Sequence, residues 1–150
     1  MKFKSIIYKI IDAGDVWAHC DLFCGVYDPA QARIEAQSVY NAMKIYHMAK
    51  DDVSRQRAVL IKEQRAELVK HHLWVLWTDY FKPEHAEKHK DLHDLFWQAT
   101  KVAGDAKKTV EPEVGQKLID LIDKIGNIFA ETKEGYQYKP IADNMSAQAK

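Results

Sequence analysis

The fold is decided by the stretch Val114-Gly115-Gln116-Lys117-Leu118-Ile119-Asp120-Leu121-Ile122-Asp123-Lys124-Ile125-Gly126-Asn127-Ile128-Phe129, which has the clearest pattern in the chain. Apolar side chains recur there every three or four residues and form one continuous stripe along a helix. The stripe consists of Val114, Leu118, Leu121, Ile122, Ile125, Ile128 and Phe129. An amphipathic helix of this kind has to be covered by other helices or by a sheet, and the rest of the chain has to supply these partners.

Three earlier stretches have the same helical spacing. The first is predicted to start with Asp28 as N-cap and Pro29 at the first helical position, and to end near Lys50. The second begins at Asp51 or Asp52 and stops before Pro83. Their expected core-facing residues are Ala32, Ala36, Val39, Met43 and Tyr46 in the first stretch, and Leu60, Ile61, Leu68, Val75 and Leu76 in the second.

The third stretch follows Pro83, and Gly104 is its expected terminator, with a loop at Lys107, Lys108 and Thr109. Its predicted core residues are Leu92, Leu95, Phe96, Ala99, Val102 and Ala103. Nothing in the sequence alternates for long as a strand does. Four amphipathic helices joined by short loops predict an all-α protein, an antiparallel four-helix bundle.

Composition narrows the functional classes. The 150 residues include 22 basic and 22 acidic side chains, so the formal net charge is zero and no global field favours nucleic acid or an anionic membrane. No apolar run approaches the roughly 20 residues of a membrane span. The N-terminal segment has only a weak likeness to a signal peptide, because Lys9 interrupts the apolar stretch and Asp12 and Asp15 follow it. A soluble single domain that binds neither nucleic acid nor membrane is expected.

The most reactive chemistry lies before the helices, in His19-Cys20-Asp21-Leu22-Phe23-Cys24-Gly25-Val26-Tyr27. This stretch, residues 19–27, is called the hook: one imidazole and two thiols fall within six positions, and Gly25 allows a tight turn. A disulfide between such close cysteines would stabilise little through chain entropy. Thiolate and nitrogen donors suit zinc, copper or nickel, and spacing alone leaves the metal open. Two reduced cysteines in an ordinary loop are the simpler interpretation.

The hook, continued by Asp28-Pro29-Ala30, closely resembles the metal hook of nickel superoxide dismutases. The similarity extends to Ile61-Lys62-Glu63-Gln64-Arg65-Ala66-Glu67-Leu68, to Lys70-His71-His72, and to Leu76-Trp77-Thr78-Asp79-Tyr80-Phe81-Lys82-Pro83. Weaker similarity reaches about Lys133. The resemblance therefore covers nearly everything except the first 18 residues and the polar tail 134–150, which we expect to be disordered or loosely docked.

The resemblance implies a leader, residues 1–18, that is removed by a maturation protease, and a mature domain of residues 19–150 whose bundle spans about 29–133. It implies one nickel ion per subunit, bound by the terminal amine and side chain of His19, the amide nitrogen and thiolate of Cys20, and the thiolate of Cys24. Nickel would cycle between +2 and +3 and convert superoxide to oxygen and hydrogen peroxide. A cytoplasmic homohexamer is the assembly expected from the family.

Six further residues receive roles from the same resemblance. Tyr27, Tyr80 and Lys82 match family positions around substrate access, Glu35 and Arg65 match residues that orient the axial imidazole, and Asp21 helps to position the hook. Without the resemblance, Tyr80 and Lys82 would be read as a helix end and Glu35 and Arg65 as surface charges. Phe23 departs from the family, which commonly has proline there, and we expect a trans bond before it.

Other readings remain open at this point. His85, His89 and His93 recur every fourth residue and would share a helix face, where they could bind zinc or copper or simply decorate a solvated surface. Trp74, Trp77 and Trp97 are interpreted as packing or interface residues. A nickel or copper protein that uses the hook without turnover, or a purely structural helical protein, are the alternatives to an enzyme.

Overall fold

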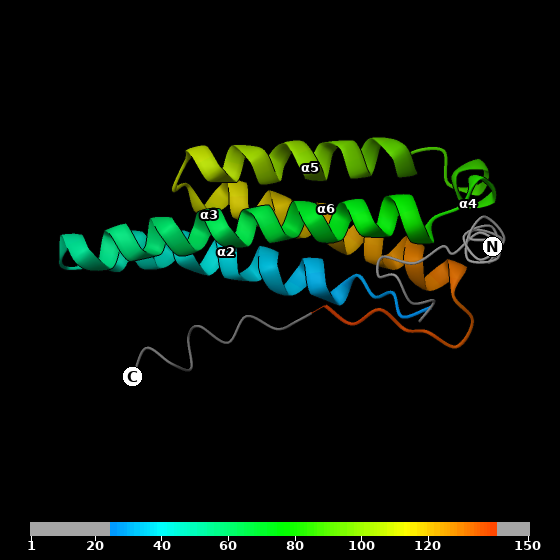
Figure 1. Ribbon diagram of the computed structural model, residues 1–150, viewed down its shortest axis with the longest axis horizontal. Coiled ribbons are helices and arrows are strands. Elements are labelled where there is room, and N and C mark those ends of the chain that lie inside the picture. The colour runs from blue at the N-terminus through cyan, green and yellow to red at the C-terminus, as the bar shows by residue number, and fades with distance from the viewer. Residues whose placement is uncertain (1–24, 141–150) are drawn as a thin grey trace, which may run out of the picture.

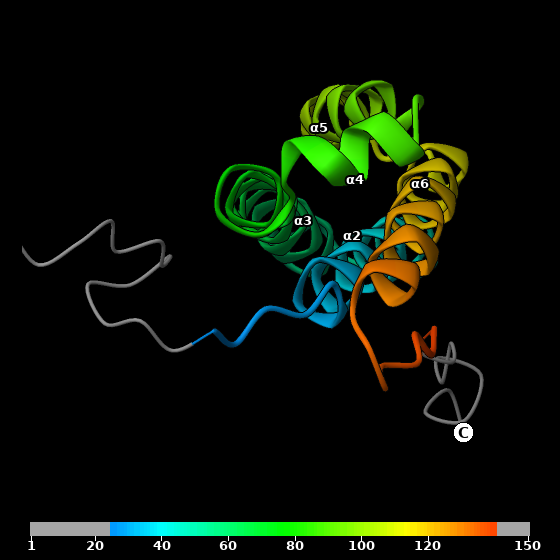
Figure 2. The same cartoon turned by 90° about the vertical axis from the view of Figure 1, so that its right-hand side faces the viewer.

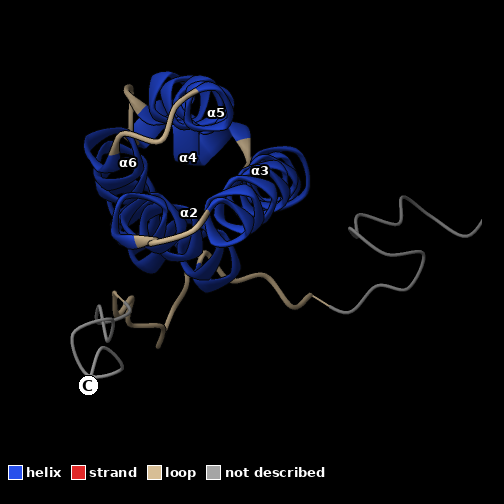
Figure 3. Cartoon of the chain, turned by 90° about the vertical axis from the view of Figure 1, so that its left-hand side faces the viewer, coloured by secondary structure: helices blue, strands red, loops and turns tan. Residues whose placement is uncertain are grey.

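The structure is a computed structural model that describes residues 25–140 and consists of four long helices and two short helical segments. The long helices are α2 (Ala30–Met48), α3 (Asp52–Val75), α5 (Leu92–Lys108) and α6 (Pro112–Thr132). The π-helical turn η1 (Leu76–Tyr80) and the short helix α4 (Pro83–Lys88) connect α3 to α5. No strand occurs between residues 25 and 140, so the predicted all-α class is confirmed (Figure 3).

The four long helices form an antiparallel ring. Helix α2 packs against α3 and α6, and α5 packs against the same two helices. Successive long helices run in opposite directions, and α4 crosses one end of the bundle (Figures 1 and 2). That end, which we call the hook end, gathers the start of α2, the end of α3 and the end of α6.

The apolar stripe of α6 is buried as predicted. Leu118, Ile122, Ile125 and Phe129 have no solvent exposure, and Val114 is half-buried against the same core. The predicted core residues of α5 are all buried, as are Ala32, Ala36, Val39 and Met43 on α2, where Tyr46 is half-buried. Helix α3 begins as predicted, since the Asp51 side chain accepts a hydrogen bond from the Ser54 amide at 2.8 Å.

The buried face of α3 differs from the prediction. Leu60 is 59% exposed, and Ile61 and Leu68 are also exposed, whereas Leu76 is buried and Val75 packs partly against the core. The face that enters the bundle consists of Ala58, Lys62, Ala66, Val69 and Leu73. Because Lys62 lies in the middle of this face, apolar periodicity does not indicate that the face is buried. Leu60, Ile61 and Leu68 do have helical spacing but face outward, and we call them the outward stripe.

Helix α5 also continues past the predicted terminator Gly104 to Lys108. Gly104 does not have the positive φ of a helix-ending glycine. The end of the helix is instead held by Lys62, whose Nζ donates to the carbonyl oxygens of Ala106, Lys107 and Thr109, each at 2.8 Å. A cation at a helix C-terminus meets both the unpaired carbonyls and the negative end of the helix dipole.

Candidate functional site at the hook end

A cleft of about 690 Å³ opens at the hook end of the bundle. Three segments that are distant in sequence meet there: the residues before α2, the stretch from η1 to the start of α4, and the end of α6. Its lining residues are Gly25, Tyr27, Thr78, Asp79, Tyr80, Phe81, Lys82, Pro83, Glu84, His85 and Thr132. The cleft thus brings together Tyr27, Tyr80 and Lys82, which the sequence assigned to one site.

Two tyrosines form one wall of the cleft. Tyr27 is only 8% exposed, and its ring lies 5.6 Å from the ring of Tyr80. Tyr80 packs on Phe129 at 4.3 Å between ring centroids, and its hydroxyl lies 2.9 Å from Oγ1 of Thr132. Burial raises the pKa of Tyr80 above its ordinary value. The phenol therefore stays protonated at neutral pH and can donate a hydrogen bond to an anion.

The backbone of η1 sets where these side chains lie. The amide of Phe81 donates to the carbonyl of Leu76 at 3.0 Å, a five-residue spacing that widens the last turn of α3. The chain then becomes extended at Phe81 and Lys82 before Pro83 starts α4. This change of direction places the exposed Lys82 at the mouth of the cleft, beside the buried Phe81.

Gly25 lies on the opposite side of the cleft with a φ of +61°, in the left-handed region that glycine reaches without strain. This backbone conformation is compatible with the tight turn that Gly25 allows. His19, Cys20, Asp21, Phe23 and Cys24 lie outside the described residues. Two thiols and an imidazole are a donor set that suits nickel, and Gly25, the residue after Cys24, lines the cleft. The residues at this end therefore fit a nickel site.

Glu35 and Arg65 form an ion pair between α2 and α3. Nη1 of Arg65 donates to both carboxylate oxygens of Glu35, at 3.2 and 3.3 Å, and the Glu35 side chain is only 14% exposed. The pairing of these two residues was not evident from their separation of 30 positions. Neither residue lines the cleft, and their predicted contact with the His19 imidazole falls outside the described residues.

The three spaced histidines do not share a helix face. His85 lies on α4, His89 is the residue after that helix, and His93 lies on α5, so the helical spacing is broken between them. His93 packs against Trp77, and His85 packs against Tyr80 and Phe81. Among residues 25–140, no group of three or more histidine, cysteine or acidic side chains could hold a metal ion.

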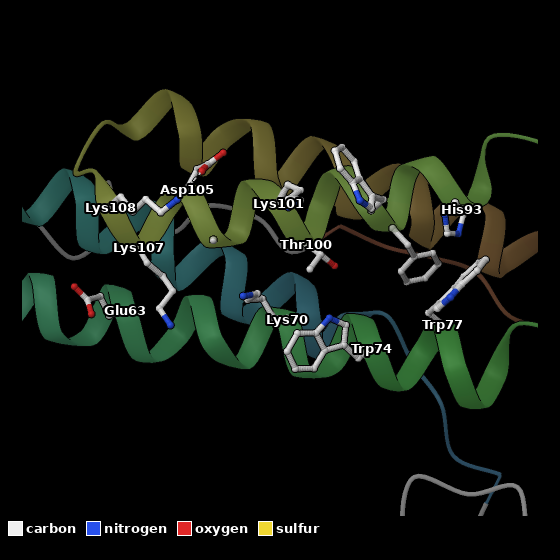
Figure 4. Close-up of a pocket in the computed structure, with 13 residues that line it drawn as sticks. Glu63, Lys70, Trp74, Trp77, His93, Thr100, Lys101, Asp105, Lys107 and Lys108 are labelled. Carbon is white, nitrogen blue, oxygen red and sulfur yellow. Dashed lines mark hydrogen bonds and ion pairs between the residues drawn. The ribbon is translucent and has the colours of Figure 1, made fainter.

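A larger groove of about 850 Å³ runs between α3 and α5 (Figure 4). Trp74 borders it from α3, Trp77 from η1, and the exposed Trp97 from α5. Lys70 lies over the Trp74 ring and Lys101 over the Trp97 ring, at 5.6 and 5.3 Å from the ring centroids. The lining of the groove also includes Glu63, His93 and Asp105.

Two residues of the cleft were missed by the sequence analysis. Thr132 bonds the Tyr80 hydroxyl from the end of α6, 52 positions away, and no local pattern signals this contact. His85 was read as part of the histidine series, although its Nδ1 accepts a hydrogen bond from the Lys82 amide at 3.2 Å. The position of His85 three residues after Lys82, at the start of a helix, is the signal that could have indicated this capping bond.

Comparison with known proteins bears directly on this site. The sequence model described as nickel-containing superoxide dismutase matches residues 14–133. The chain is 58% identical over 120 residues to superoxide dismutase [Ni] of Streptomyces seoulensis and 56% identical to that of Streptomyces coelicolor. Each match covers 79% of this chain and 91% of the relative.

Solved structures agree with the sequence matches. A native nickel superoxide dismutase structure aligns with a TM-score of 0.75 and 53% identity, covering 78% of this chain and all of that one. A nickel-containing superoxide dismutase with ligation of the oxidized state aligns with a TM-score of 0.74 and 54% identity, over the same shares. No helix between residues 25 and 140 is long and apolar enough to span a membrane.

Proposed function

This chain belongs to the nickel-containing superoxide dismutase family, and from that premise we propose that it converts superoxide to oxygen and hydrogen peroxide with nickel bound by His19, Cys20 and Cys24. The ligands would be the amine and imidazole of His19, the amide nitrogen and thiolate of Cys20, and the thiolate of Cys24. One nickel ion is expected per subunit.

The observation that carries the proposal is the cleft that begins where the hook ends. Gly25 and Tyr27, one and three residues after Cys24, line it together with Tyr80 and Lys82. Bound nickel supplies one-electron chemistry between its +2 and +3 states, because anionic sulfur and nitrogen donors make the higher state accessible. Two superoxide ions and two protons then give one molecule of oxygen and one of hydrogen peroxide.

The residues of the cleft handle the substrate. Lys82 is an exposed cation at its mouth and attracts the superoxide anion locally, although the net charge of the chain is zero. The phenols of Tyr27 and Tyr80 narrow the approach, and the Tyr80 hydroxyl donates toward a bound anion or toward Thr132. Phe81 and Phe129 exclude water behind Tyr80.

Glu35, Arg65 and Asp21 are assigned supporting roles in this proposal. The Glu35 carboxylate is largely buried and fixed by Arg65, so it is a rigid acceptor for an imidazole N–H. Such a partner holds a ligating histidine in one tautomer and orientation. Asp21 would position the hook through backbone hydrogen bonds.

The proposal requires cleavage before His19, because an amide nitrogen bonded to Ala18 is a poor donor compared with a free amine. The sharpest test compares two chains that differ by one residue, one starting at His19 and one starting at Ala18. Both are loaded with nickel and assayed for superoxide dismutation. Activity is expected only from the first chain, with both chains retaining the helical content of the bundle.

Three outcomes of this test distinguish the possibilities. Dismutation by the chain that starts at Ala18 would contradict the role of the amine. Stoichiometric nickel without dismutation in the chain that starts at His19 would indicate a nickel-binding protein without turnover. Loading both chains with copper as well as nickel shows whether copper, which often binds nitrogen and sulfur donors more tightly, competes for the hook.

A homohexamer in the cytoplasm, matured by a separate protease, completes the proposal. Support for assembly comes from the outward stripe of α3, where Leu60, Ile61 and Leu68 are exposed. It also comes from the α3–α5 groove (Figure 4), where Trp74 and Trp97 are exposed. Large apolar and aromatic side chains exposed on one side of a bundle are typical of protein interfaces. Sedimentation of the mature chain tests the subunit number.

A further inference from the structure

The C-terminal end of the described chain returns to Tyr27 and Asp28, which join the hook to α2. We call these two residues the base of the hook. After α6, residues 133–138 leave the bundle end and run back along α2 and α6; we call this segment the strap (Figure 1). The family match ends at residue 133, so residues 134–138 belong to the part of the chain that the match does not include. The sequence analysis expected residues 134–150 to be disordered or loosely docked.

Two tyrosines of the strap dock on carboxylates of the bundle. The Tyr136 hydroxyl donates to Asp28 Oδ1 at 2.8 Å, and the Tyr138 hydroxyl donates to Asp123 Oδ1 at 2.6 Å. Alternate residues of an extended segment point to the same side, so both rings face the bundle while Gln137 is exposed. Residues 136–138 are therefore docked on the bundle by two specific hydrogen bonds.

Each docking residue has a second contact that fixes it. The Tyr136 ring packs edge-on against Phe129 at 5.0 Å, and Asp123 Oδ1 also accepts from Nε of the buried Arg33 at 2.8 Å. The Tyr138 ring lies flat on α6 at Gly126, where a Cβ would come within 2.5 Å of two ring atoms. Burial and the carboxylate partners raise the pKa of both tyrosines, so both hydroxyls remain donors throughout the neutral range.

The strap holds the two residues that leave the hook. Nζ of Lys133 donates to the carbonyl oxygen of Tyr27 at 3.0 Å. Asp28 Oδ1, which receives Tyr136, also accepts the Ala30 amide at 2.7 Å and so caps α2. With its ring against Tyr80, Tyr27 is fixed through its side chain and its backbone.

We propose that the strap positions the base of the hook for metal capture, with Tyr136 and Lys133 acting as positioning residues through Tyr27 and Asp28. This inference rests on the proposed function of the hook as a nickel site. A chain segment that is anchored at its exit loses less conformational freedom when it closes on a metal ion. Release of the strap therefore weakens nickel retention without removing any ligand.

The test uses the mature chain, residues 19–150, loaded with nickel and then challenged with EDTA. Tyr136→Phe removes the bond to Asp28, and Gly126→Ala displaces Tyr138 without changing either tyrosine. Each variant is expected to lose nickel about 3- to 10-fold faster than the parent, an effect of the size of one ordinary hydrogen bond. Tyr46→Phe makes the same chemical change at the other end of α2. It is the matched control and should lose nickel at the rate of the parent.

The double variant adds a decisive readout. Because both changes release one strap, Tyr136→Phe with Gly126→Ala should lose nickel little faster than either single variant. Equal rates of nickel loss in the parent and both single variants would overturn the inference. The same conclusion would follow if the metal-free variants unfolded at a lower midpoint but lost nickel at the rate of the parent. A parent chain that binds no nickel would instead overturn the proposed function of the hook, and the strap's role with it.

Discussion

At the scale of single residues, the cleft combines the exposed cation of Lys82 with the packed aromatic rings of Tyr27 and Tyr80. Tyr80 is held by Phe129 and Thr132, and Tyr27 by Tyr80 and Lys133, so neither phenol can reorient freely. Lys82 is exposed, and its long side chain can follow an approaching anion. In the proposed function, attraction and orientation of superoxide are thus assigned to different residues of the same cleft.

This division leads to a prediction for Lys82→Gln. The variant is expected to lower the second-order rate constant for superoxide about 2- to 5-fold at low ionic strength, because one steering charge is lost. The difference from the parent should shrink as salt screens the field. Pulse radiolysis across an ionic-strength series measures both effects. Lys124→Gln, an exposed lysine on α6, is the control, and a salt-independent loss in Lys82→Gln would argue against steering.

At the scale of elements, α5 depends on a residue of α3. Lys62 is 2% exposed and donates to three carbonyl oxygens at the end of α5. We expect Lys62→Met to destabilise the protein by about 1–3 kcal/mol, since a similar stem is kept while these carbonyls lose their donor. Urea unfolding measures the change. Amide exchange should accelerate first in residues 104–108, and uniform acceleration along the whole chain would contradict a local cap.

The short helix α4 gives a pH-dependent prediction. The Lys82 amide donates to Nδ1 of His85, and this nitrogen can accept only when the imidazole is neutral. Burial lowers the pKa of His85 below its usual 6.5. Among the smaller effects, Glu84 raises this pKa, and Lys82, His89 and Lys88 lower it. The unfolded chain then binds this proton more tightly than the folded chain. The stabilisation is therefore complete above pH 6.5 and is lost as pH falls through the lower folded pKa.

Amide exchange at Lys82 measures this effect. Its protection factor should fall between pH 7 and pH 5 relative to the amides of the α6 core. In His85→Ala the protection of Lys82 should be low and independent of pH over the same range. A protection factor that falls equally in His85→Ala would show that another group is responsible.

Local patterns predicted the elements where one face is purely apolar. The stripe of α6 and the core residues of α5 follow from sequence because every buried position is hydrophobic. The buried face of α3 was assigned wrongly because Lys62 interrupts it, and the end of α5 because its cap comes from 44 to 47 positions away. Tyr27, Tyr80 and Lys82 were selected through the family resemblance. The contacts of Thr132 with Tyr80 and of Tyr136 with Asp28 depend on packing across the bundle, so no local pattern predicts them.

At the scale of the whole molecule, the outward surface of α3 calls for an explanation. Val53, Leu60, Ile61, Leu68 and Trp74 are exposed along one helix, and Trp97 is 56% exposed across the groove. A single bundle leaves this apolar surface in water, whereas a neighbouring subunit would cover it. The outward stripe that misled the sequence analysis of α3 is thus the feature that supports the proposed assembly.

The assembly gives the last prediction, made for Leu60→Glu. A carboxylate in the outward stripe would be buried without a partner in an interface, so the variant is expected to sediment as smaller species than the parent at the same concentration. The fold should persist, because Leu60 is 59% exposed in the single bundle and contributes little to its core. Gln116→Glu introduces the same charge at an exposed position of α6 and should leave the sedimentation coefficient unchanged. If Leu60→Glu sediments like the parent, the outward stripe of α3 does not form the interface, and the subunit contacts have to lie on another face of the bundle.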